Sequence, residues 1–463
     1  MSVRDADMRL GDHHRRNVPE DELSDPPLPA AAERMREAGG TLFEEFMRGS
    51  LTEWALVRQR IDAREIADVR EAVRTALEPL MAKVSSGTRV CLAVGSRGID
   101  RIDQVVAAAV ERMREAGARV FLVPAMGSHG GATAEGQLRV LASYGITPAV
   151  VGCEIRSSME TVELGEVRPG VPVFFDRVAF EDADMIVPIN RVKPHTDFSA
   201  EIESGLSKMI AIGLGKQKGA DALHRQGFAR FYELIPAVAA FTLAHARIPF
   251  GLALIENGHA RLMHVEAVPA AQIEERERQL LQIARNAMAR IPLAEIDVLV
   301  LDFIGKDISG LGMDSNVVGR YYTGQTGIPP AIQRIVVRDL TSETEGNAVG
   351  IGMADVVLRR TVERMDQRKT YVNCVTAKTP EGARIPLTVD NDREALAVAI
   401  ACCVKVRPQE ARIVRARDTK HLERLYVSAP LLPELLASGQ VEVIEPVHPI
   451  PFDAAGMLAE DVP

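Results

Sequence analysis

Short apolar runs that alternate with amphipathic stretches constrain the fold of this chain more than any other feature. The run at 89–95 (RVCLAVG) ends at a glycine, and the stretch at 102–116 (IDQVVAAAVERMREA) has apolar residues at helical spacing. A second apolar run follows at 119–124 (RVFLVP). Runs that are apolar at nearly every position predict strands buried on both faces of a parallel sheet. Together the three segments predict one strand–helix–strand unit.

The same alternation continues along the chain. The pattern predicts further strands and helices, with helices near 66–82, 134–144, 232–246 and 271–290 and strands near 183–189, 250–255 and 296–305. Strands that alternate with helices are typical of α/β folds with parallel sheets. We therefore expect an α/β protein with two α/β domains, largely parallel sheets and an active-site cleft between the domains.

The length of 463 residues exceeds the usual extent of one hydrophobic core, which favours more than one domain. The first residues are charged, contain prolines and lack the apolar stretch of a secretory signal. The expected parts are a flexible N-terminal tail, a catalytic domain, a second α/β domain and a C-terminal extension, at 1–33, 34–285, 286–430 and 431–463.

Composition limits the classes of partner. A net charge of −9 and a single tryptophan argue against nucleic-acid binding. The chain contains no apolar run of the roughly 18 residues that a membrane span requires. Its five cysteines form no CxxC pair and are odd in number, as expected for a protein of the reducing cytoplasm. We expect a cytoplasmic protein with a small-molecule partner, and an assembly of identical copies stays open.

Polar loops follow three of the predicted strands. Ser96 and Arg97 follow the first strand, His129 follows the second, and Lys193 and His195 follow the third. Ligands of open parallel sheets bind beyond the carboxyl ends of the strands, where such loops meet. Glycines beside Arg97 and His129 allow an anion to approach the backbone closely. The loops therefore predict a site for a carboxylate or phosphate, although each alone is also compatible with an ordinary glycine turn.

A glycine-rich segment at 203–219 carries Ser204, Gly205 and Lys208. Its order of glycine, lysine and hydroxyl residues is not that of a Walker A loop, so ATP hydrolysis is not indicated. An apolar setting favours the neutral, nucleophilic form of a lysine amine, and a solvated surface lysine is the alternative. His224 follows Lys208 by sixteen positions.

Three imidazoles are available for chemistry, those of His129, His195 and His224. They could together bind a divalent ion such as nickel or zinc, or divide between metal ligation and general acid–base work. A second glycine-rich loop at 305–316 follows a later strand. We expect it to face the cleft, where its Lys306, Asp307 and Asn316 could close over a ligand, and a purely structural loop is the alternative.

These residues resemble the lactate racemase family, whose members invert the carbon of 2-hydroxy acids with a nickel-pincer nucleotide. The likeness covers roughly residues 85–260 by motif. SGLSKMIAIGLG is similar to the family's Ser-Gly-Gly-x-Lys segment, whose lysine carries the cofactor covalently. The resemblance implies that Lys208 has this role, with Ser204 and Gly205 beside the cofactor, and that His224 ligates nickel. We also expect Lys306, from the loop at 305–316, to contact the cofactor.

The resemblance also implies the catalytic residues. His129 and His195 match the two acid–base histidines, while Ser96 and Arg97, with Lys193, would hold the substrate carboxylate. Three features differ from the family pattern: the segment between His195 and Lys208 is three residues longer, Gly130 rather than arginine follows the loop histidine, and GSRG replaces Asp-x-Thr-Arg-Pro. The implied reaction is racemisation or epimerisation at C2 of a 2-hydroxy acid through a metal-containing cofactor and a 2-keto acid intermediate.

Two alternatives stay open from the sequence. One is a 2-hydroxy acid racemase that uses bare zinc held by three histidines, and the other is a non-catalytic nucleotide- or metal-binding protein. A nicotinamide dehydrogenase is not indicated, because GSRGID is not the GxGxxG fingerprint. The sequence does not distinguish a racemase from an epimerase or identify the 2-hydroxy acid.

Overall fold

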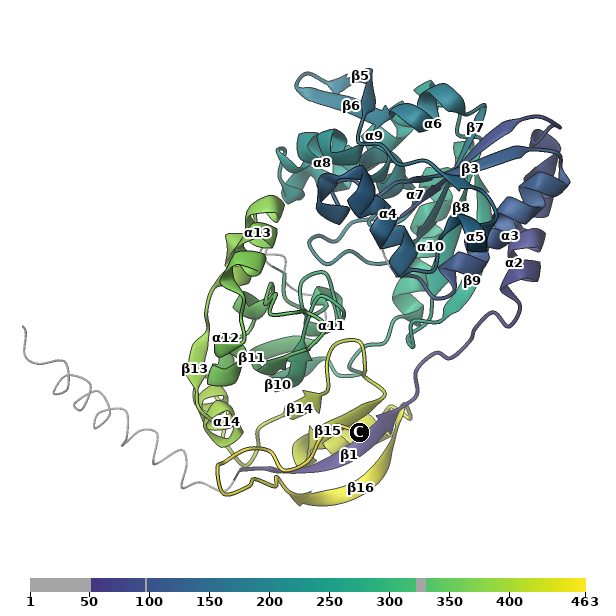
Figure 1. Ribbon diagram of the computed structural model, residues 1–463. Coiled ribbons are helices and arrows are strands. Elements are labelled where there is room, and N and C mark those ends of the chain that lie inside the picture. The colour runs from purple at the N-terminus through teal and green to yellow at the C-terminus, as the bar shows by residue number, and fades with distance from the viewer. Residues whose placement is uncertain (1–50, 96–97, 322–329) are drawn as a thin grey trace, which may run out of the picture. The chain divides into compact units, whose positions relative to one another are not determined.

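The computed structural model describes residues 51–95, 98–321 and 330–463. It contains two large β-sheets. Both sheets are parallel over most of their strands, with antiparallel strands added at one edge. Helices connect the parallel strands (Figure 1). The predicted α/β class with largely parallel sheets is confirmed.

The first sheet has six strands in the order β4-β3-β2-β7-β8-β9. Their bounds are Glu154–Ile155, Arg119–Pro124, Arg89–Val94, Met185–Arg191, Phe250–Glu256 and Leu262–Pro269. Neighbours from β4 to β8 are parallel, and only β9 runs antiparallel to its neighbour β8. The carboxyl ends of β2, β3 and β7 therefore lie at one edge of the sheet, as expected for the loops that follow them.

Side chains of β2 alternate between two hydrophobic cores. Val90, Leu92 and Val94 join the core under α2 (Val69–Leu77) and α3 (Ile102–Glu115), which lie side by side in Figure 1. Cys91 and Ala93 join the core under the helices of the opposite face. A strand buried on both faces must be apolar throughout, which explains the unbroken apolar run in the sequence.

The opposite face of this sheet carries the segment of greatest functional interest. It is covered by α7 (Leu206–Lys208), the π-helical turn η4 (Met209–Gly213), α8 (Lys216–His224), α9 (Phe231–His245) and α10 (Ile273–Ala287). The remaining helices of this region are α4 (Ala134–Ser143), α5 (Pro148–Val151) and α6 (Arg177–Asp182). The hairpin β5 (Thr161–Arg168) and β6 (Val171–Asp176), which the sequence did not predict, packs against α8 and α9.

The second sheet has eight strands in the order β13-β12-β11-β10-β14-β15-β1-β16. Their bounds are Leu387–Val389, Val356–Leu358, Ala331–Leu340, Glu295–Ile304, Ile413–Ala416, Arg424–Ser428, Glu53–Gln59 and Val441–Pro449. The strands from β13 to β14 are parallel, and β15, β1 and β16 add antiparallel pairs.

Strands from opposite ends of the described chain pair in this sheet. β1 lies between β15 and β16, so the purple and yellow strands run side by side in Figure 1. The predicted domain limits place β1 in the catalytic domain and β16 in the C-terminal extension, yet both strands belong to the sheet of β10. The strands of this sheet therefore come from both ends of the described chain. The domain limits near 285 and 430 stay predictions.

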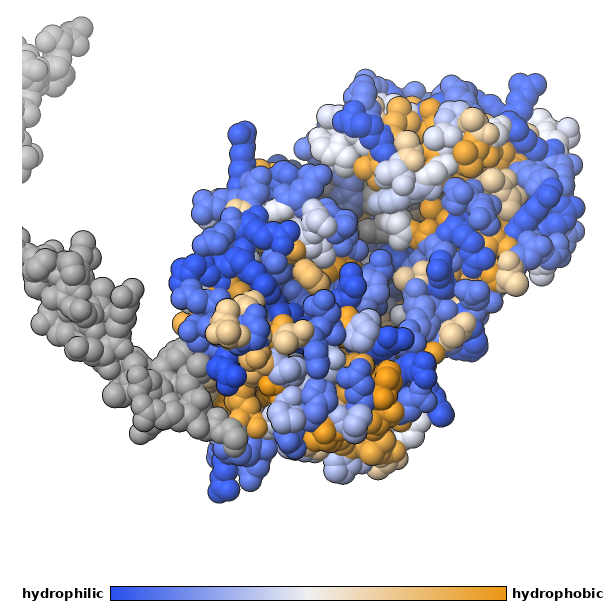
Figure 2. All heavy atoms as spheres, turned by 60° about the horizontal axis from the view of Figure 1, so that its bottom comes forward, coloured by the Kyte–Doolittle hydropathy of each residue, from blue (hydrophilic) through white to orange (hydrophobic). Residues whose placement is uncertain are grey.

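Helices cover both faces of the second sheet, and its cores are separate from those of the first. The helices are α11 (Ser315–Val318), α12 (Arg359–Glu363), α13 (Gln367–Ala377), α14 (Asp392–Ala401) and α15 (Leu432–Ala437). Single 3-10 turns complete the described elements at Glu78–Lys83, Gly130–Ala132, Phe228–Arg230, Ala270–Gln272, Ile351–Met353, Pro380–Ala383 and Ala429–Leu431. Figure 2 turns the β16 side forward and shows small orange apolar patches among blue hydrophilic residues.

Within the described residues, no single helix is long and apolar enough to cross a membrane. One pair, Lys216–His224 with Phe228–His245, meets the test jointly by length and composition, with a bend of 92° between its members.

Candidate active site

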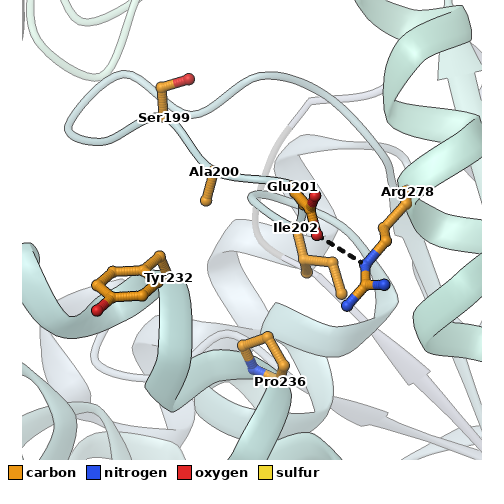
Figure 3. A pocket seen from close by; sticks show the side chains of 7 residues that line it. All are labelled: Ser199, Ala200, Glu201, Ile202, Tyr232, Pro236 and Arg278. Atoms are coloured by element: carbon orange, nitrogen blue, oxygen red, sulfur yellow. Dashed lines mark ion pairs between the residues drawn. The ribbon is translucent and has the colours of Figure 1, made fainter.

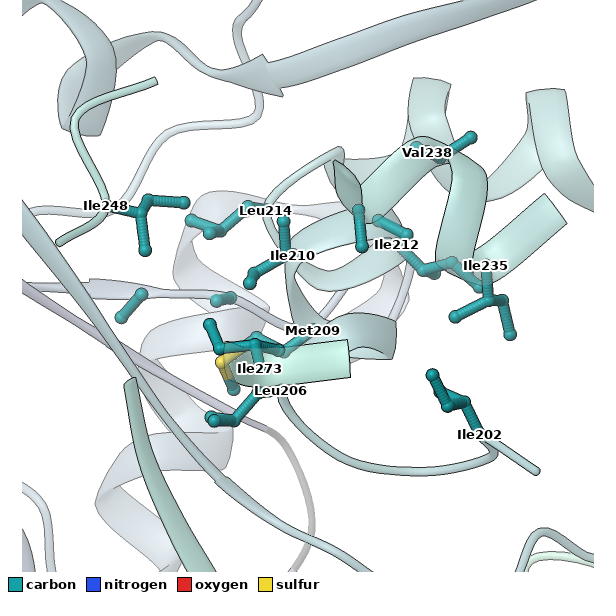
Figure 4. Close-up of a cluster of buried hydrophobic side chains, with 14 of the residues drawn as sticks. Ile202, Leu206, Met209, Ile210, Ile212, Leu214, Ile235, Val238, Ile248 and Ile273 are labelled. Atoms are coloured by element: carbon teal, nitrogen blue, oxygen red, sulfur yellow. The ribbon is translucent and has the colours of Figure 1, made fainter. Parts of the chain in front are cut away.

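Apolar packing holds the backbone on both sides of Lys208. Leu206 and Met209 flank the lysine and are buried in the core of the first sheet. Figure 4 shows them among side chains of the turn η4, of α9 and of α10, including Ile235 and Ile273. Lys208 itself is half-buried and directly precedes the π-helical turn. Such turns are rare and occur often at functional sites, so the lysine stands on a rigid and unusual backbone.

A buried carboxyl group on α10 holds the segment before Lys208 in place through hydrogen bonds. Glu277 on α10 accepts a hydrogen bond from the backbone N–H of Ser207 at 2.9 Å and another from its hydroxyl. Burial raises the pKa of Glu277 to about 7, although the bonds from Ser207 act in the opposite direction. Gly205 makes room for this group, because a Cβ there would lie 1.7 Å from Glu277 Oε1. The predicted cofactor contact Gly205 thus has a packing role, and its carbonyl accepts a bond from Asn190 at 2.7 Å.

The structure brings His195 into contact with Lys208, as Nζ of the lysine meets Nε2 of the imidazole. The ring of His195 is buried and lies against Phe198, with 4.5 Å between ring centroids. Its other nitrogen, Nδ1, accepts a hydrogen bond from the backbone N–H of Asp197 at 3.0 Å. The carboxylate oxygen of Asp197 lies 3.6 Å from Nδ1, beyond hydrogen-bonding distance. Both ring nitrogens of His195 are therefore engaged in this state.

A hydrogen bond to its own helix fixes the tautomer of His224. Its Nδ1 lies 2.6 Å from the carbonyl oxygen of Ala220, one helical turn earlier on α8, and donates its proton there. Nε2 then carries the lone pair. Burial lowers the pKa of His224. The imidazole is therefore neutral at physiological pH, the form that binds metal ions.

Aromatic rings connect the two histidines. The ring of Phe231 on α9 lies 5.3 Å from that of His224 and 5.6 Å from that of Phe198, which in turn packs on His195. Phe228 lies edge-on to His224 at 5.5 Å. Phe198 and Phe231 thus link the rings of His195 and His224, and Lys208 meets His195 in the same cluster. The sequence did not predict these aromatic contacts.

The loop that carries His195 is shaped by Glu203, a residue the sequence analysis did not select. Glu203 is 1% exposed and accepts bonds from the backbone N–H groups of His195 at 2.5 Å and Ala200 at 2.8 Å. Arg285 on α10 neutralises it, with 2.5 Å between Nη2 and Oε1. The residues beside Glu203 in the sequence, Ile202 and Ser204, gave no sign that this acid is buried. Its burial requires the partners that the fold supplies.

A second buried pair joins the loop after β3 to α8. Lys216, at the start of α8, is fully buried and lies 2.8 Å from Asp176 Oδ2. Its Nζ also donates to the carbonyl of Pro124 at 2.6 Å and to Gln137 Oε1 at 3.2 Å. Pro124 ends the strand that precedes the His129 loop, so this lysine positions the loop relative to the helix of His224.

His129 lies in that loop with an exposed side chain. Its carbonyl accepts a bond from Gln137 Nε2 at 3.4 Å, and its N–H donates to Met126 at 3.1 Å. Gly130 follows in the left-handed region, with φ of 67°, and a Cβ there would lie 2.5 Å from the backbone of Gly136. The close approach of the loop to α4 explains this glycine without a ligand.

The second glycine-rich loop reaches the site through Asn316. Its Nδ2 donates to the carbonyl of His195 at 3.0 Å, and its Oδ1 accepts from the hydroxyl of Tyr321 at 2.7 Å. Lys193 Nζ lies 3.7 Å from Asp314 Oδ2 in the same loop, and Lys193 pairs with Ser204 through the backbone. The loop therefore contacts the segment that carries His195, and its closure over a ligand in a cleft stays a prediction.

Other predicted residues are placed differently. The Nζ of Lys306 donates to Gly310 at 2.7 Å, and Asp307 accepts from Thr341 at 2.6 Å, so both bonds stay within or beside their own loop. Ser96 and Arg97 lie outside the described residues. Among the described residues, ligand atoms of His129, His195 and His224 do not gather within 4.8 Å of one another, whereas those of Glu445, His448 and Glu460 do.

A pocket of about 300 Å³ opens beside the site rather than at it. Figure 3 shows its lining from the loop after His195 and from α9 and α10: Ser199, Ala200, Glu201, Ile202, Tyr232, Pro236 and Arg278. Glu201 and Arg278 form an ion pair of 3.3 Å across it. None of the predicted site residues lines this pocket, so we do not assign it to the substrate.

Comparisons with known proteins place the fold. No protein-family model matches the chain, and no curated protein matches its sequence. Among solved structures, the lactate racemase apoprotein from Thermoanaerobacterium thermosaccharolyticum is similar, with a TM-score of 0.50 and 15% identity over 79% of this chain and 94% of that one. The chain therefore has a lactate racemase-like fold, which agrees with the resemblance seen in the sequence.

Proposed function

We propose that this protein is an isomerase that inverts C2 of a 2-hydroxy acid, as a racemase or epimerase. The observation that carries the proposal is the cluster of Lys208, His195 and His224 on a lactate racemase-like fold. The neutral His224 offers Nε2 to a metal, and Lys208 offers an amine next to an imidazole. A small 2-hydroxy acid in the cytoplasm is the proposed substrate, without a role for nucleic acid or membrane.

The donor set fits the nickel-pincer nucleotide that the resemblance implies. His224 would ligate nickel, and Lys208 would bind the organic part covalently, with Ser204, Gly205 and Lys306 near it. When bound, this cofactor supplies an electron-poor centre able to accept the C2 hydrogen with its electron pair. Zinc would instead act as a Lewis acid on the hydroxy acid, and metal analysis distinguishes the two.

Hydrogen bonding around His195 supports a neutral Lys208. Because Nδ1 accepts the N–H of Asp197, the neutral ring carries its proton on Nε2 and points it at the lysine. An ammonium group cannot accept that proton, whereas an uncharged amine can. The contact therefore favours the nucleophilic form of Lys208, as covalent attachment of a cofactor requires.

His195 becomes a base when Lys208 withdraws from Nε2. A shift of the ring proton to Nδ1, toward the Asp197 carboxylate, leaves the Nε2 lone pair free to take the proton of the substrate hydroxyl. Asp197 would then position the imidazole and stabilise its charged form. His129 would perform the same transfer on the opposite face, and Arg97, with Ser96 and Lys193, would hold the carboxylate. Asp197, like Glu203 and Glu277, was not among the residues selected from the sequence.

The test uses the full chain loaded with nickel-pincer nucleotide and a set of enantiopure 2-hydroxy acids, followed by chiral chromatography. We expect interconversion of the C2 epimers of at least one acid. Lys208→Ala and His224→Ala should abolish it, while Lys218→Ala and His245→Ala should not. Lys218 is the control for Lys208, because it is a lysine on the next helix, α8, with an exposed side chain. His245 is the control for His224, because its Nδ1 also bonds the carbonyl one turn earlier and its ring also lies beside a phenylalanine.

An experiment in D₂O distinguishes hydride transfer from proton abstraction. In D₂O the product should keep protium at C2, because a hydrogen that leaves with its electron pair does not exchange with water. Incorporation of deuterium would contradict the hydride route and favour proton abstraction. A loaded protein that interconverts none of the acids would contradict the racemase proposal and leave the nucleotide- or metal-binding alternative.

A further inference from the structure

Three side chains near the C-terminus form a group that the proposed reaction does not use. We propose that Glu445, His448 and Glu460 bind a divalent transition-metal ion such as Zn²⁺. One ligand atom from each lies within 4.8 Å of the others. The ring nitrogen Nε2 of His448 is 4.0 Å from Glu445 Oε2 and 4.0 Å from Glu460 Oε2.

Two of these atoms have unmet bonding capacity. His448 Nε2 and Glu460 Oε2 are shielded from solvent and have no hydrogen-bond partner in the described structure. A separation of 4.0 Å is too long for a direct hydrogen bond, whereas ligands that each lie about 2.0 to 2.2 Å from one ion span this distance. Buried polar atoms without partners are costly, and a shared cation would satisfy them together.

The orientation of His448 suits a metal. Its Nδ1 lies 3.0 Å from the carbonyl oxygen of Pro449 and donates its proton there, so Nε2 holds the lone pair. The Glu460 carboxyl has a similar outer contact with the hydroxyl of Tyr426.

A β-bulge turns the two strand residues to the same side. Residues three apart on a regular strand face opposite sides of the sheet. Here His448 lies opposite Trp54 while Glu445 lies opposite Leu56, so β16 uses one residue more than β1 across this step. The additional residue turns one side chain to the other side of the sheet, so Glu445 and His448 both lie on the face that carries Trp54 and Leu56.

The third ligand, Glu460, lies in the segment after β16, which packs against the core on both sides of this residue. Leu458 and Val462, on either side of Glu460, are buried in the core that contains Trp54. The N–H of Leu458 donates to Asp392 Oδ2 at 2.8 Å. Anchors on both sides hold Glu460 against β16, so the site joins strand and tail in a fixed geometry.

The donor chemistry selects the kind of ion. Among the described residues, neither Glu445 nor Glu460 forms an ion pair with a lysine or arginine. Two carboxylates and one imidazole favour zinc, manganese, cobalt or nickel over calcium and magnesium, which prefer all-oxygen sites. Water would complete the coordination, because the site is half-buried.

The single tryptophan of the chain reports on this site. Trp54 stacks on Tyr426 with 4.7 Å between ring centroids and pairs with His448 across the sheet. The experiment uses the full chain with His224→Ala, which removes the proposed nickel ligand, stripped with EDTA and titrated with Co²⁺. We expect saturable quenching of Trp54 fluorescence below about 100 μM Co²⁺, competed by Zn²⁺.

His448→Gln and Glu460→Gln should each weaken Co²⁺ binding by at least the roughly tenfold loss typical of a lost outer-shell contact. His421→Gln is the matched control, because His421 pairs with Asp418 at 2.8 Å elsewhere and should leave quenching unchanged. Circular dichroism establishes that each variant is folded. Absence of saturable quenching, or equal quenching in both folded site variants, would overturn the proposal, and neither outcome bears on racemase activity.

Discussion

Lys216 and Asp176 form an ion pair of 2.8 Å in which neither side chain is exposed to solvent. The pair joins the start of α8 to the end of β6, and the lysine also bonds the carbonyl that ends β3. Asp176 has a second task, since its Oδ1 caps α6 by accepting the N–H of Ala179 at 2.8 Å. Four elements around the candidate site, α8, β6, β3 and α6, therefore depend on one buried charge pair.

Loss of one partner should be costly. Asp176→Asn keeps the cap but leaves the Lys216 ammonium buried beside a neutral group, and breaking such pairs costs about 3 to 5 kcal/mol. We expect a fall of this order in the free energy of unfolding measured in urea. Asp184→Asn, which breaks the exposed pair with Arg89, should change stability far less. Equal effects of the two variants would show that the buried pair is not a structural support.

Glu277 should make stability depend on pH near neutrality. Its pKa is raised by burial from 4.5 to about 7, so the folded state holds a proton that the unfolded state releases between these values. Stability is therefore greatest below pH 4.5 with respect to this group and declines as pH rises toward 7. The shift corresponds to a change on the order of 3 kcal/mol.

Glu277→Gln should remove this component, because an amide keeps the size and an acceptor but does not titrate. The measurement is the difference in unfolding free energy between wild type and variant at several values from pH 5 to pH 8. We expect the wild type to lose stability relative to the variant as pH rises. A difference that is constant with pH would mean that Glu277 is ionised throughout.

Gly205→Ala tests the same contact sterically. The new methyl group would lie 1.7 Å from Glu277 Oε1, so the variant should lose several kcal/mol or shift the Lys208 segment. Glu277→Ala removes the obstacle, and the double variant should be more stable than the sum of the single effects predicts. Gly219→Ala is the control on α8, where neighbours stay at 3.8 Å or beyond. Additive effects in the double variant would contradict the proposed clash.

The strands of the first sheet were predictable because their chemistry is local. A strand buried on both faces, such as β2, must be apolar throughout, and a helix such as α3 must repeat its apolar face. The hairpin β5–β6 was missed because β5 is only partly buried and its residues mix polar with apolar types. The pairing of β1 with β16 spans almost the whole chain, and no local pattern specifies it.

The candidate site shows the same division. The resemblance to the lactate racemase family selected Lys208 and His224, and the strand-end rule selected His195, whereas their supports come from distant elements. Glu277 belongs to α10, about seventy residues after Lys208, and its role depends on the absence of a side chain at Gly205. Such supports are fixed by tertiary packing, which the sequence pattern does not reveal.

Asp197 offers the most direct test of the proposed mechanism. Its carboxylate oxygen lies 3.6 Å from Nδ1 of His195, on the side where the Nδ1 proton would point when Nε2 acts on substrate. Asp197→Asn keeps the shape and the backbone N–H but removes the charge that stabilises the imidazolium. We expect kcat to fall by roughly 10²-fold or more. KM should change little, because Asp197 stabilises His195 only when the imidazole becomes positively charged in the transition state.

The pH profile separates this role from a structural one. Without the neighbouring anion, the acidic limb of the rate profile should move to lower pH, since the imidazolium of His195 loses a stabilising charge. Glu201→Gln, in the same loop and paired with Arg278 at 3.3 Å, should change neither kcat nor the limb. If Asp197→Asn lowers kcat without moving the limb, Asp197 shapes the loop through its backbone environment and His195 does not depend on its charge.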